Sequence, residues 1–305
     1  MSGKARAHLR FTSLILLFFS LFLPVAYGES ASAHHGCLYR VSQQGHTVWL
    51  FGTIHVGTAS IDPLDGQAGA ELARADKLVL EINVEDSMTV NTALLAHAMY
   101  GPGDSIDKHL SQAALDRLGK AMTHAGIPLE AVSNMKPWFI ADLLMLKTLG
   151  EQGYSAEEAA EMKLASYANE HEKPIGELES AEFQFGLFDR MNGKQQEQYL
   201  LENLDELESG KAARETEQMF NAWVNADEAA LKPLLKEMSD DKGPTMRFIQ
   251  HEFLEKRNPP MADKIAGMLK TDKNVFVGVG WLHLIGKDGV PELLTRRGYE
   301  VTRIY

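Results

Sequence analysis

The 305-residue chain contains a single cysteine, Cys37. No intramolecular disulfide can form, so the fold must depend on a buried core rather than on covalent cross-links. With 45% hydrophobic residues, the chain can bury such a core as one large domain or as a domain with an insertion. A cysteine nucleophile is also disfavoured, because Cys37 lies near an expected terminus and has no paired base.

Positive charge is scarce in this chain. There are 30 Lys and Arg residues against 42 Asp and Glu residues, and the formal net charge is −12. Such a protein is not expected to bind nucleic acid or anionic lipid through bulk electrostatics. The Gly-x-Ser-x-Gly turn of many serine hydrolases is also absent from the sequence, which disfavours that class of enzyme.

Only one long apolar run is present, from Phe11 to Val25. Its 15 residues are fewer than the ~20 that a membrane-spanning helix needs. Three basic residues precede the run, and the small residues of Ala26-Tyr27-Gly28 follow it. This order is typical of a cleaved secretory signal, with an uncleaved anchor as the alternative. We therefore expect residues 1–28 to be a signal peptide, and a periplasmic or secreted mature chain, 29–305, without a membrane span.

The remaining chain predicts strands at both ends and helices between them. The middle region, about residues 107–269, has helical apolar spacing with breaks at Gly and Pro residues. Apolar, β-branched runs predict strands over residues 38–41, 48–51, 77–82, 173–178, 275–279 and 299–304. The simplest assembly is an α/β (α+β) fold, in which a central mixed sheet is built from the N- and C-terminal segments.

Two segments with almost the same local pattern give the strongest indication of function. The chain reads Gly52-Thr53-Ile54-His55 after one apolar run and, 228 positions later, Gly280-Trp281-Leu282-His283 after another. A glycine past a strand end permits a sharp turn or a close backbone approach, which would direct each histidine to a common point. Imidazole is the commonest metal ligand and titrates near neutral pH. The pair therefore predicts a metal or acid–base site, although a single Gly-x-x-His is more often a turn with a hydrogen-bonded histidine.

We expect His55 and His283 to face one another across one pocket, because strand ends tend to form sites. Imidazoles more than ~12 Å apart would exceed what one ion could bridge at ligand distances of ~2.1 Å. Glu81 is the best candidate for a third metal ligand or a catalytic base. It ends the apolar run Leu78-Val79-Leu80, where a charge is costly unless it is paired or metal-bound. The alternative for Glu81 is a strand-end carboxylate that faces water.

Two further charged residues are candidates for a catalytic role. Arg257 could hold a substrate carboxylate or a tetrahedral oxyanion, because a guanidinium is a fixed and always-charged fork. The alternative is a structural ion pair with Glu255 or Glu81. Glu179 follows a predicted strand in the same way as Glu81 and is a weaker candidate. The alternative for Asn258 is that it only caps the helix before Pro259-Pro260.

Several motifs in a fixed order resemble the TraB/PrgY/GumN family, which includes the Tiki-like membrane proteases and is distantly related to erythromycin-esterase-like hydrolases. The resemblance covers about residues 38–305. It includes both Gly-x-x-His segments, Leu78 to Glu81, Met135 to Trp138, Lys173-Pro174, Leu178-Glu179, Gln184, Glu255 to Asn258, His283 to Val290 and Arg297-Gly298-Tyr299. Family members often carry Gly-x-Asp where this chain has Ala159-Ala160-Glu161, so no role is assigned to Glu161.

The resemblance implies a metal-dependent peptidase for the Tiki-like branch, with the two Gly-x-x-His motifs as its site. We therefore expect a hydrolase that acts on a peptide bond and binds Mn, Co or Zn through His55, His283 and Glu81. One alternative is a metal-free hydrolase of small esters with histidine as general base. A second alternative is a non-catalytic protein that binds a peptide. Metal content separates the first two hypotheses, and turnover separates both from the third.

The signal prediction gives an expected mature terminus near Glu29 or His34, since Ala31-Ser32-Ala33 offers a second cleavage point. Mass spectrometry of the exported protein measures this terminus directly. An intact chain that begins at Met1 and stays in the cytosol would contradict the prediction.

Overall fold

A six-stranded mixed sheet, with the strand order β4-β3-β5-β2-β1-β6, is the centre of the fold. The computed structural model describes residues 34–305, so the predicted signal peptide and its cleavage points lie outside the described residues. The strands are β1 (Leu38–Gln43), β2 (His46–Thr53), β3 (Lys77–Leu80), β4 (Ile175–Glu177), β5 (Asn274–Gly280) and β6 (Glu300–Arg303). As expected, strands from both ends of the chain share one sheet.

The direction of the strands decides where the site forms. β5 is parallel to both β2 and β3, and β3 is parallel to β4. β1 runs antiparallel to β2 and to β6. The central strand β5 is buried at every position after Asn274, which is typical of a parallel strand covered on both faces. The carboxyl ends of β4, β3, β5 and β2 therefore meet at one edge of the sheet.

Helices fill the middle of the chain, at breaks that the sequence predicts. α4 and α10 begin at prolines, where a missing N–H costs nothing, and α7 begins with a capping box of Asn192 and Gln195. The helices of this region are α2 (Ser87–Ala98), α3 (Gln112–His124), α4 (Pro137–Glu151), α5 (Ala160–Glu170), α6 (Ala181–Gly186), α7 (Gly193–Glu208), α8 (Lys211–Val224), α9 (Lys232–Asp240), α10 (Pro244–Phe248) and α11 (Asn258–Thr271). A π-helix, η5 (Ile249–Glu255), joins α10 to the turn before α11.

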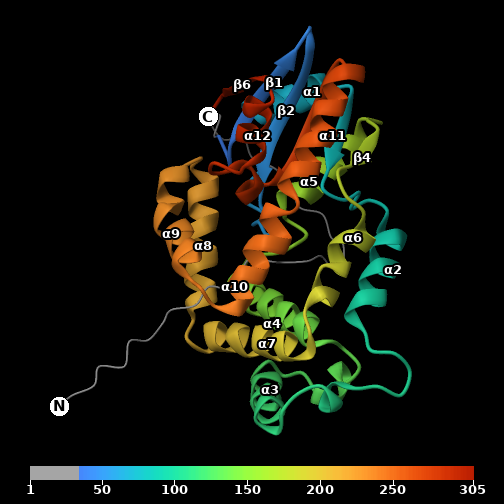
Figure 1. Cartoon of the computed structure of the whole chain (residues 1–305), viewed down its shortest axis with the longest axis vertical. Helices are drawn as coiled ribbons and strands as arrows, with labels where there is room; N and C mark the ends of the chain where they lie inside the picture. The colour runs from blue at the N-terminus through green and yellow to red at the C-terminus, as the bar shows by residue number, and fades with distance from the viewer. Residues whose placement is uncertain (1–33) are drawn as a thin grey trace, which may run out of the picture.

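The helices form two groups around the sheet edge (Figure 1). α11 contacts β1 and β2, α5 contacts β3, and α1 (Gln67–Arg74) contacts β5, so these helices share one hydrophobic cluster with the sheet. α2, α3, α4, α6 and α7 form a second cluster beyond the edge. α8 and α9 lie side by side at one flank in the view of Figure 1. After β5, the short 3-10 helix η6 (Trp281–Leu284) and α12 (Val290–Arg296) lead to the last strand, β6.

The expected fold class is confirmed: a mixed sheet from both termini carries a largely helical middle region. The helical region begins earlier than predicted, at α2. Its buried residues Val90, Ala93, Leu94 and Ala98 have the spacing of one helix face. Within residues 34–305, no helix is long and apolar enough to cross a membrane.

The α4–α7 interface contains a buried carboxyl group whose titration should affect stability. Burial raises the pKa of Asp142 well above its usual value, and the hydrogen bond from the Tyr199 hydroxyl, at 3.0 Å, only partly offsets that effect. Because the pKa of Asp142 is raised in the folded state, its protonated carboxyl contributes fully to stability below the usual carboxyl pKa of about 3.9. This contribution is lost as the pH rises toward the folded-state pKa.

As the pH rises from 4 to 8, the unfolding free energy of wild type should fall by about 1–3 kcal/mol more than that of Asp142→Asn, because the amide cannot ionise. Urea unfolding across this pH range measures the difference. Parallel curves for the two proteins would show that Asp142 does not titrate with folding.

Candidate functional site

The parallel strands deliver four chemically active side chains to one edge of the sheet. His55 follows β2, Glu81 follows β3, Glu179 follows β4, and His283 lies in η6 directly after β5. The register pairs Thr53 with Gly280, the last residues of β2 and β5, so the two strands end at the same level and the two Gly-x-x-His motifs are offset by one residue. His55, Glu81 and His283 line one pocket together with Arg257, whereas Glu179 lies behind Arg257 and does not line it.

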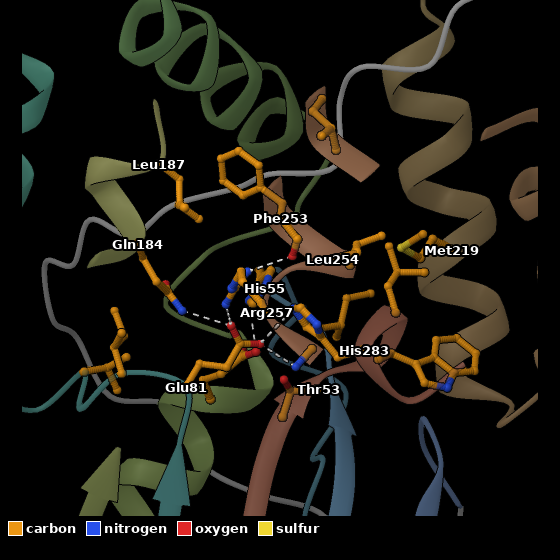
Figure 2. Close-up of a pocket in the computed structure, with 18 of the residues that line it drawn as sticks. Thr53, His55, Glu81, Gln184, Leu187, Met219, Phe253, Leu254, Arg257 and His283 are labelled. Atoms are coloured by element: carbon orange, nitrogen blue, oxygen red, sulfur yellow. Dashed lines mark hydrogen bonds and ion pairs between the residues drawn. The ribbon is translucent and has the colours of Figure 1, made fainter. Parts of the chain in front are cut away.

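The two histidines face the same small space (Figure 2). A methyl group placed on Gly280 would lie 3.5 Å from His55 Nε2 and 3.6 Å from His283 Cδ2. The two rings are therefore closer than the sum of these distances, well inside the predicted limit of ~12 Å for a shared ion. The expectation that His55 and His283 meet across one pocket is confirmed.

The ring of His283 is buried and held as the neutral tautomer. Its Nδ1 donates a hydrogen bond to Asn258 Oδ1 at 2.6 Å, and the Asn258 amide donates in turn to the Asp288 carbonyl at 2.9 Å. The second bond fixes the amide so that its oxygen faces the ring. Burial, followed by the charge of Arg257, lowers the pKa of His283 to about 3. At neutral pH the ring is uncharged, and its Nε2 lone pair points into the pocket.

The ring of His55 is held by a buried carboxylate. Its Nδ1 lies 2.9 Å from Glu161 Oε1, and Glu161 is only 3% exposed. Desolvation would lower the pKa of His55, but the charges of Glu161 and Glu81 outweigh this and raise it to about 9. The His55 side chain is 35% exposed, against 5% for His283, so solvent reaches the site past His55.

A network of charged hydrogen bonds fixes the third predicted site residue, Glu81. Its Oε1 accepts a bond from the Gly280 N–H at 2.7 Å, and its Oε2 accepts from Gln184 at 3.0 Å and from Arg257 Nη2. Burial would raise the pKa of Glu81, but Arg257, both imidazoles and the Gly280 N–H hold it well below its usual range. Glu81 is therefore a carboxylate at neutral pH, and the alternative of a water-facing strand end is wrong, since it is 7% exposed.

Arg257 connects the two carboxylates rather than standing free in the pocket. Its Nε lies 2.9 Å from Glu179 Oε2, its Nη1 donates to the Phe253 carbonyl at 3.2 Å, and its Nη2 contacts both Glu81 and Glu179. Of the two roles considered for Arg257, this geometry favours the structural ion pair with Glu81. Glu255 is not a partner of Arg257, because it pairs with His251 at the surface instead.

The charges of the site do not balance when both imidazoles are neutral. Glu81, Glu161 and Glu179 are all buried, and Arg257 is the one guanidinium beside them among the described residues, so two negative charges are left over with His55 neutral and one with His55 protonated. Burying an unpaired carboxylate is costly. Both oxygens of Glu161 also lack a hydrogen-bond donor, apart from the ion pair with His55. A bound divalent cation would neutralise this excess.

The donor set fits a divalent transition metal, although it is not arranged as a complete metal site. Each histidine has a partner on Nδ1 and a free Nε2, which is the usual state of a metal-binding imidazole. His283 Nε2 lies 4.0 Å from Glu81 Oε1, and two ligands of one ion at ~2.1 Å each are at most ~4.2 Å apart. Within residues 34–305, however, no three His, Cys, Asp or Glu side chains are already grouped as metal ligands. Small side-chain movements would have to complete the site.

Sequence reasoning left the roles of two site residues open. Glu161 received no role, because the family's Gly-x-Asp pattern is altered there, yet its carboxylate is the partner of His55. Asn258 was considered as a helix cap, yet its side chain orients His283. The segment around Glu161 contains several other acids, of which Glu157 and Glu170 are exposed, so its sequence does not single out Glu161 as a site residue.

This fold and site define a class of protein with two strand-end histidines around a buried carboxylate. The chain matches the sequence model of the TraB/PrgY/gumN family over residues 37–303, so it belongs to that family. It is similar to an uncharacterized protein, YbaP, of Escherichia coli (strain K12), and to the uncharacterized YbaP of Shigella flexneri. Each is 27% identical to it over 250 residues, which cover 80% of this chain and 86% of the relative. No solved structure matches the chain.

Replacement of Gly52 or Gly280 by alanine should affect the protein in different ways, the first its stability and the second its pocket. Neither has a positive φ, so close packing is what requires them. A Cβ on Gly52 would lie 2.7 Å from Trp281 Cδ1 and 2.9 Å from Cys37 Sγ, inside the core. We expect Gly52→Ala to lower the melting temperature by about 2–10 °C through overpacking.

A Cβ on Gly280 would instead lie 3.0 Å from Glu81 Oε1, inside the pocket. We expect Gly280→Ala to shift the ring signals of His55 and His283 in NMR spectra, with little change in melting temperature. A lowered melting temperature for Gly280→Ala together with shifted histidine signals for Gly52→Ala would contradict these roles of the two glycines.

Proposed function

We propose that this protein is a metal-dependent hydrolase that acts on peptide bonds, with His55, His283 and Glu81 as metal ligands. The observation that carries the proposal is the pair of imidazoles with free Nε2 atoms, both within reach of the Glu81 carboxylate and both oriented through Nδ1. When bound, a divalent ion such as Mn, Co or Zn supplies Lewis acidity and a water of lowered pKa.

The residues of the chain have separate tasks in this proposal. Glu161 and Asn258 hold the tautomers in which Nε2 is the free atom of His55 and His283. Glu81 serves as a ligand rather than a general base, since a carboxylate with a strongly lowered pKa accepts a proton poorly. Arg257 positions Glu81, and Glu179 positions Arg257 from behind.

The metal-free alternative depends on the His55–Glu161 pair, which has the arrangement of a histidine base with its orienting acid. The same pair, however, raises the pKa of His55 to about 9, so the ring is protonated at neutral pH and cannot accept a proton. A metal ion would displace this proton from His55 Nε2 as it binds, whereas the metal-free mechanism has no group that removes it, which favours the metal-dependent proposal over ester hydrolysis with histidine as base. Non-catalytic peptide binding remains the outcome that a lack of turnover would support.

The proposed setting is the periplasm or the outside of the cell. The order of basic, apolar and small residues before residue 29 motivates it. The family membership and the site geometry do not depend on this localisation.

Replacement of His55 or His283 by alanine should abolish tight binding of one divalent ion per chain, because each variant removes one of two nitrogen ligands. Calorimetric titration of the chain without its signal segment, with manganese, cobalt and zinc, measures this. His124→Ala is the matched control, since His124 is exposed on α3 and far from the pocket in sequence and structure. Thermal unfolding checks that each variant is folded.

If wild type binds none of these ions more tightly than the variant that lacks both His55 and His283, the metal proposal is wrong. Hydrolysis of peptides by the metal-free wild type at an unchanged rate would support the metal-free mechanism instead.

A further inference from the structure

The pocket has two chemically different halves. Its polar half consists of the side chains at the sheet edge: His55, Glu81, Glu161, Arg257 and His283. Its other half is an apolar wall, contributed by α8, α9, η5 and η6, and formed by Met219, Met238, Ile249, Phe253, Leu254 and Leu282. In Figure 2, Phe253, Leu254 and Met219 lie above the two imidazoles, and Glu81 and Thr53 lie below them.

The charged groups of the pocket are already committed to one another. Arg257 bonds to Glu81 and Glu179, and His55 pairs with Glu161. Among the described residues that line the pocket, no further cation could receive a substrate carboxylate. Recognition of a substrate must therefore come from the apolar wall.

The composition of this wall indicates what it would accept. Met219 and Met238 are buried, and their unbranched, polarizable side chains adjust to apolar groups of different shape. Leu254 and Leu282 are partly exposed at the same wall, so the protein leaves apolar surface uncovered beside the histidines. A ligand pocket that is mostly apolar and has few convergent polar groups is typical of a substrate site.

We propose that this wall is a specificity subsite, which takes an apolar side chain of a peptide substrate next to the bond that is cleaved. The inference rests on the proposed hydrolase function and names its substrate class. Leucine and methionine side chains should both be accepted, because Met219 and Met238 can repack around either. Aspartate and lysine should both be rejected, because either would bury a charged group against apolar side chains.

Binding of model peptides tests the subsite separately from catalysis. The probes are five-residue peptides of alanine and glycine in which only the central residue varies between Leu, Met, Asp and Lys. Calorimetry is carried out with wild type and with the variant that combines His55→Ala and His283→Ala. Both proteins should bind the Leu and Met peptides at least about tenfold more tightly than the Asp and Lys peptides.

Two substitutions at partly exposed wall positions, Leu254→Lys and Leu282→Gln, should reduce binding of the Leu peptide by at least about tenfold. Met88→Lys is the matched control, because Met88 is 79% exposed on α2 and should leave binding unchanged. Thermal unfolding identifies any variant that fails to fold. The proposal is overturned if wild type binds none of the peptides, if it binds all four equally, or if both folded wall variants keep the preference for Leu.

Turnover separates this inference from the hydrolase proposal. Peptides that bind with the expected preference but are not cleaved in the presence of metal would refute the hydrolase and leave the subsite standing. Cleavage at equal rates whatever the central residue would refute the subsite and leave the hydrolase standing.

Discussion

The parallel pairing of β2 with β5 is the constraint on which the candidate site depends. These strands lie at opposite ends of the chain, and their register aligns Thr53 with Gly280. Because the pairing is parallel, both strands end at the same edge and both Gly-x-x-His turns leave it together. A shift by one residue would turn every side chain of β5 to the other face of the sheet and separate His55 from His283.

The buried ions add a second constraint, which acts on the side chains rather than on the backbone. Glu81 would be a costly buried charge without Arg257, and Arg257 would be costly without Glu81 and Glu179. Removing one partner of such a group typically costs about 3–5 kcal/mol, because it leaves an uncompensated charge. The network therefore holds Glu81 beside the two imidazoles and fixes the polar half of the pocket. The apolar wall opposite it comes from α8 and α9 and from η5 and η6, which lie next to Arg257 and His283 in the sequence.

Much of this organisation could be predicted from the sequence, because the signals for it are local. The apolar runs around Leu50 and Val277 are strong strand signals, and the glycines that follow mark the strand ends. Glu81 can be predicted as a site residue because a charge that directly follows a buried apolar run needs a partner. Helix α2 could also have been predicted from the spacing of Val90, Ala93 and Leu94.

The partners within the site could not be predicted in this way. Glu161 reaches His55 across more than a hundred residues, and Asn258 reaches His283 from another helix. Nothing near Arg257 in sequence indicates that its guanidinium is shared between Glu81 and Glu179. Such contacts depend on how α5, α6 and the segment after η5 pack over the sheet edge, and local patterns do not encode that packing.

The central claim is that one divalent ion joins the ends of β2, β3 and β5. Anomalous X-ray diffraction at the cobalt edge, from crystals grown with cobalt, tests it most directly. The account predicts one strong peak per chain, within about 2.5 Å of His55 Nε2, His283 Nε2 and a carboxylate oxygen of Glu81. Well-ordered His55 and His283 side chains with no anomalous peak between them, at a cobalt concentration that labels other sites, would contradict it.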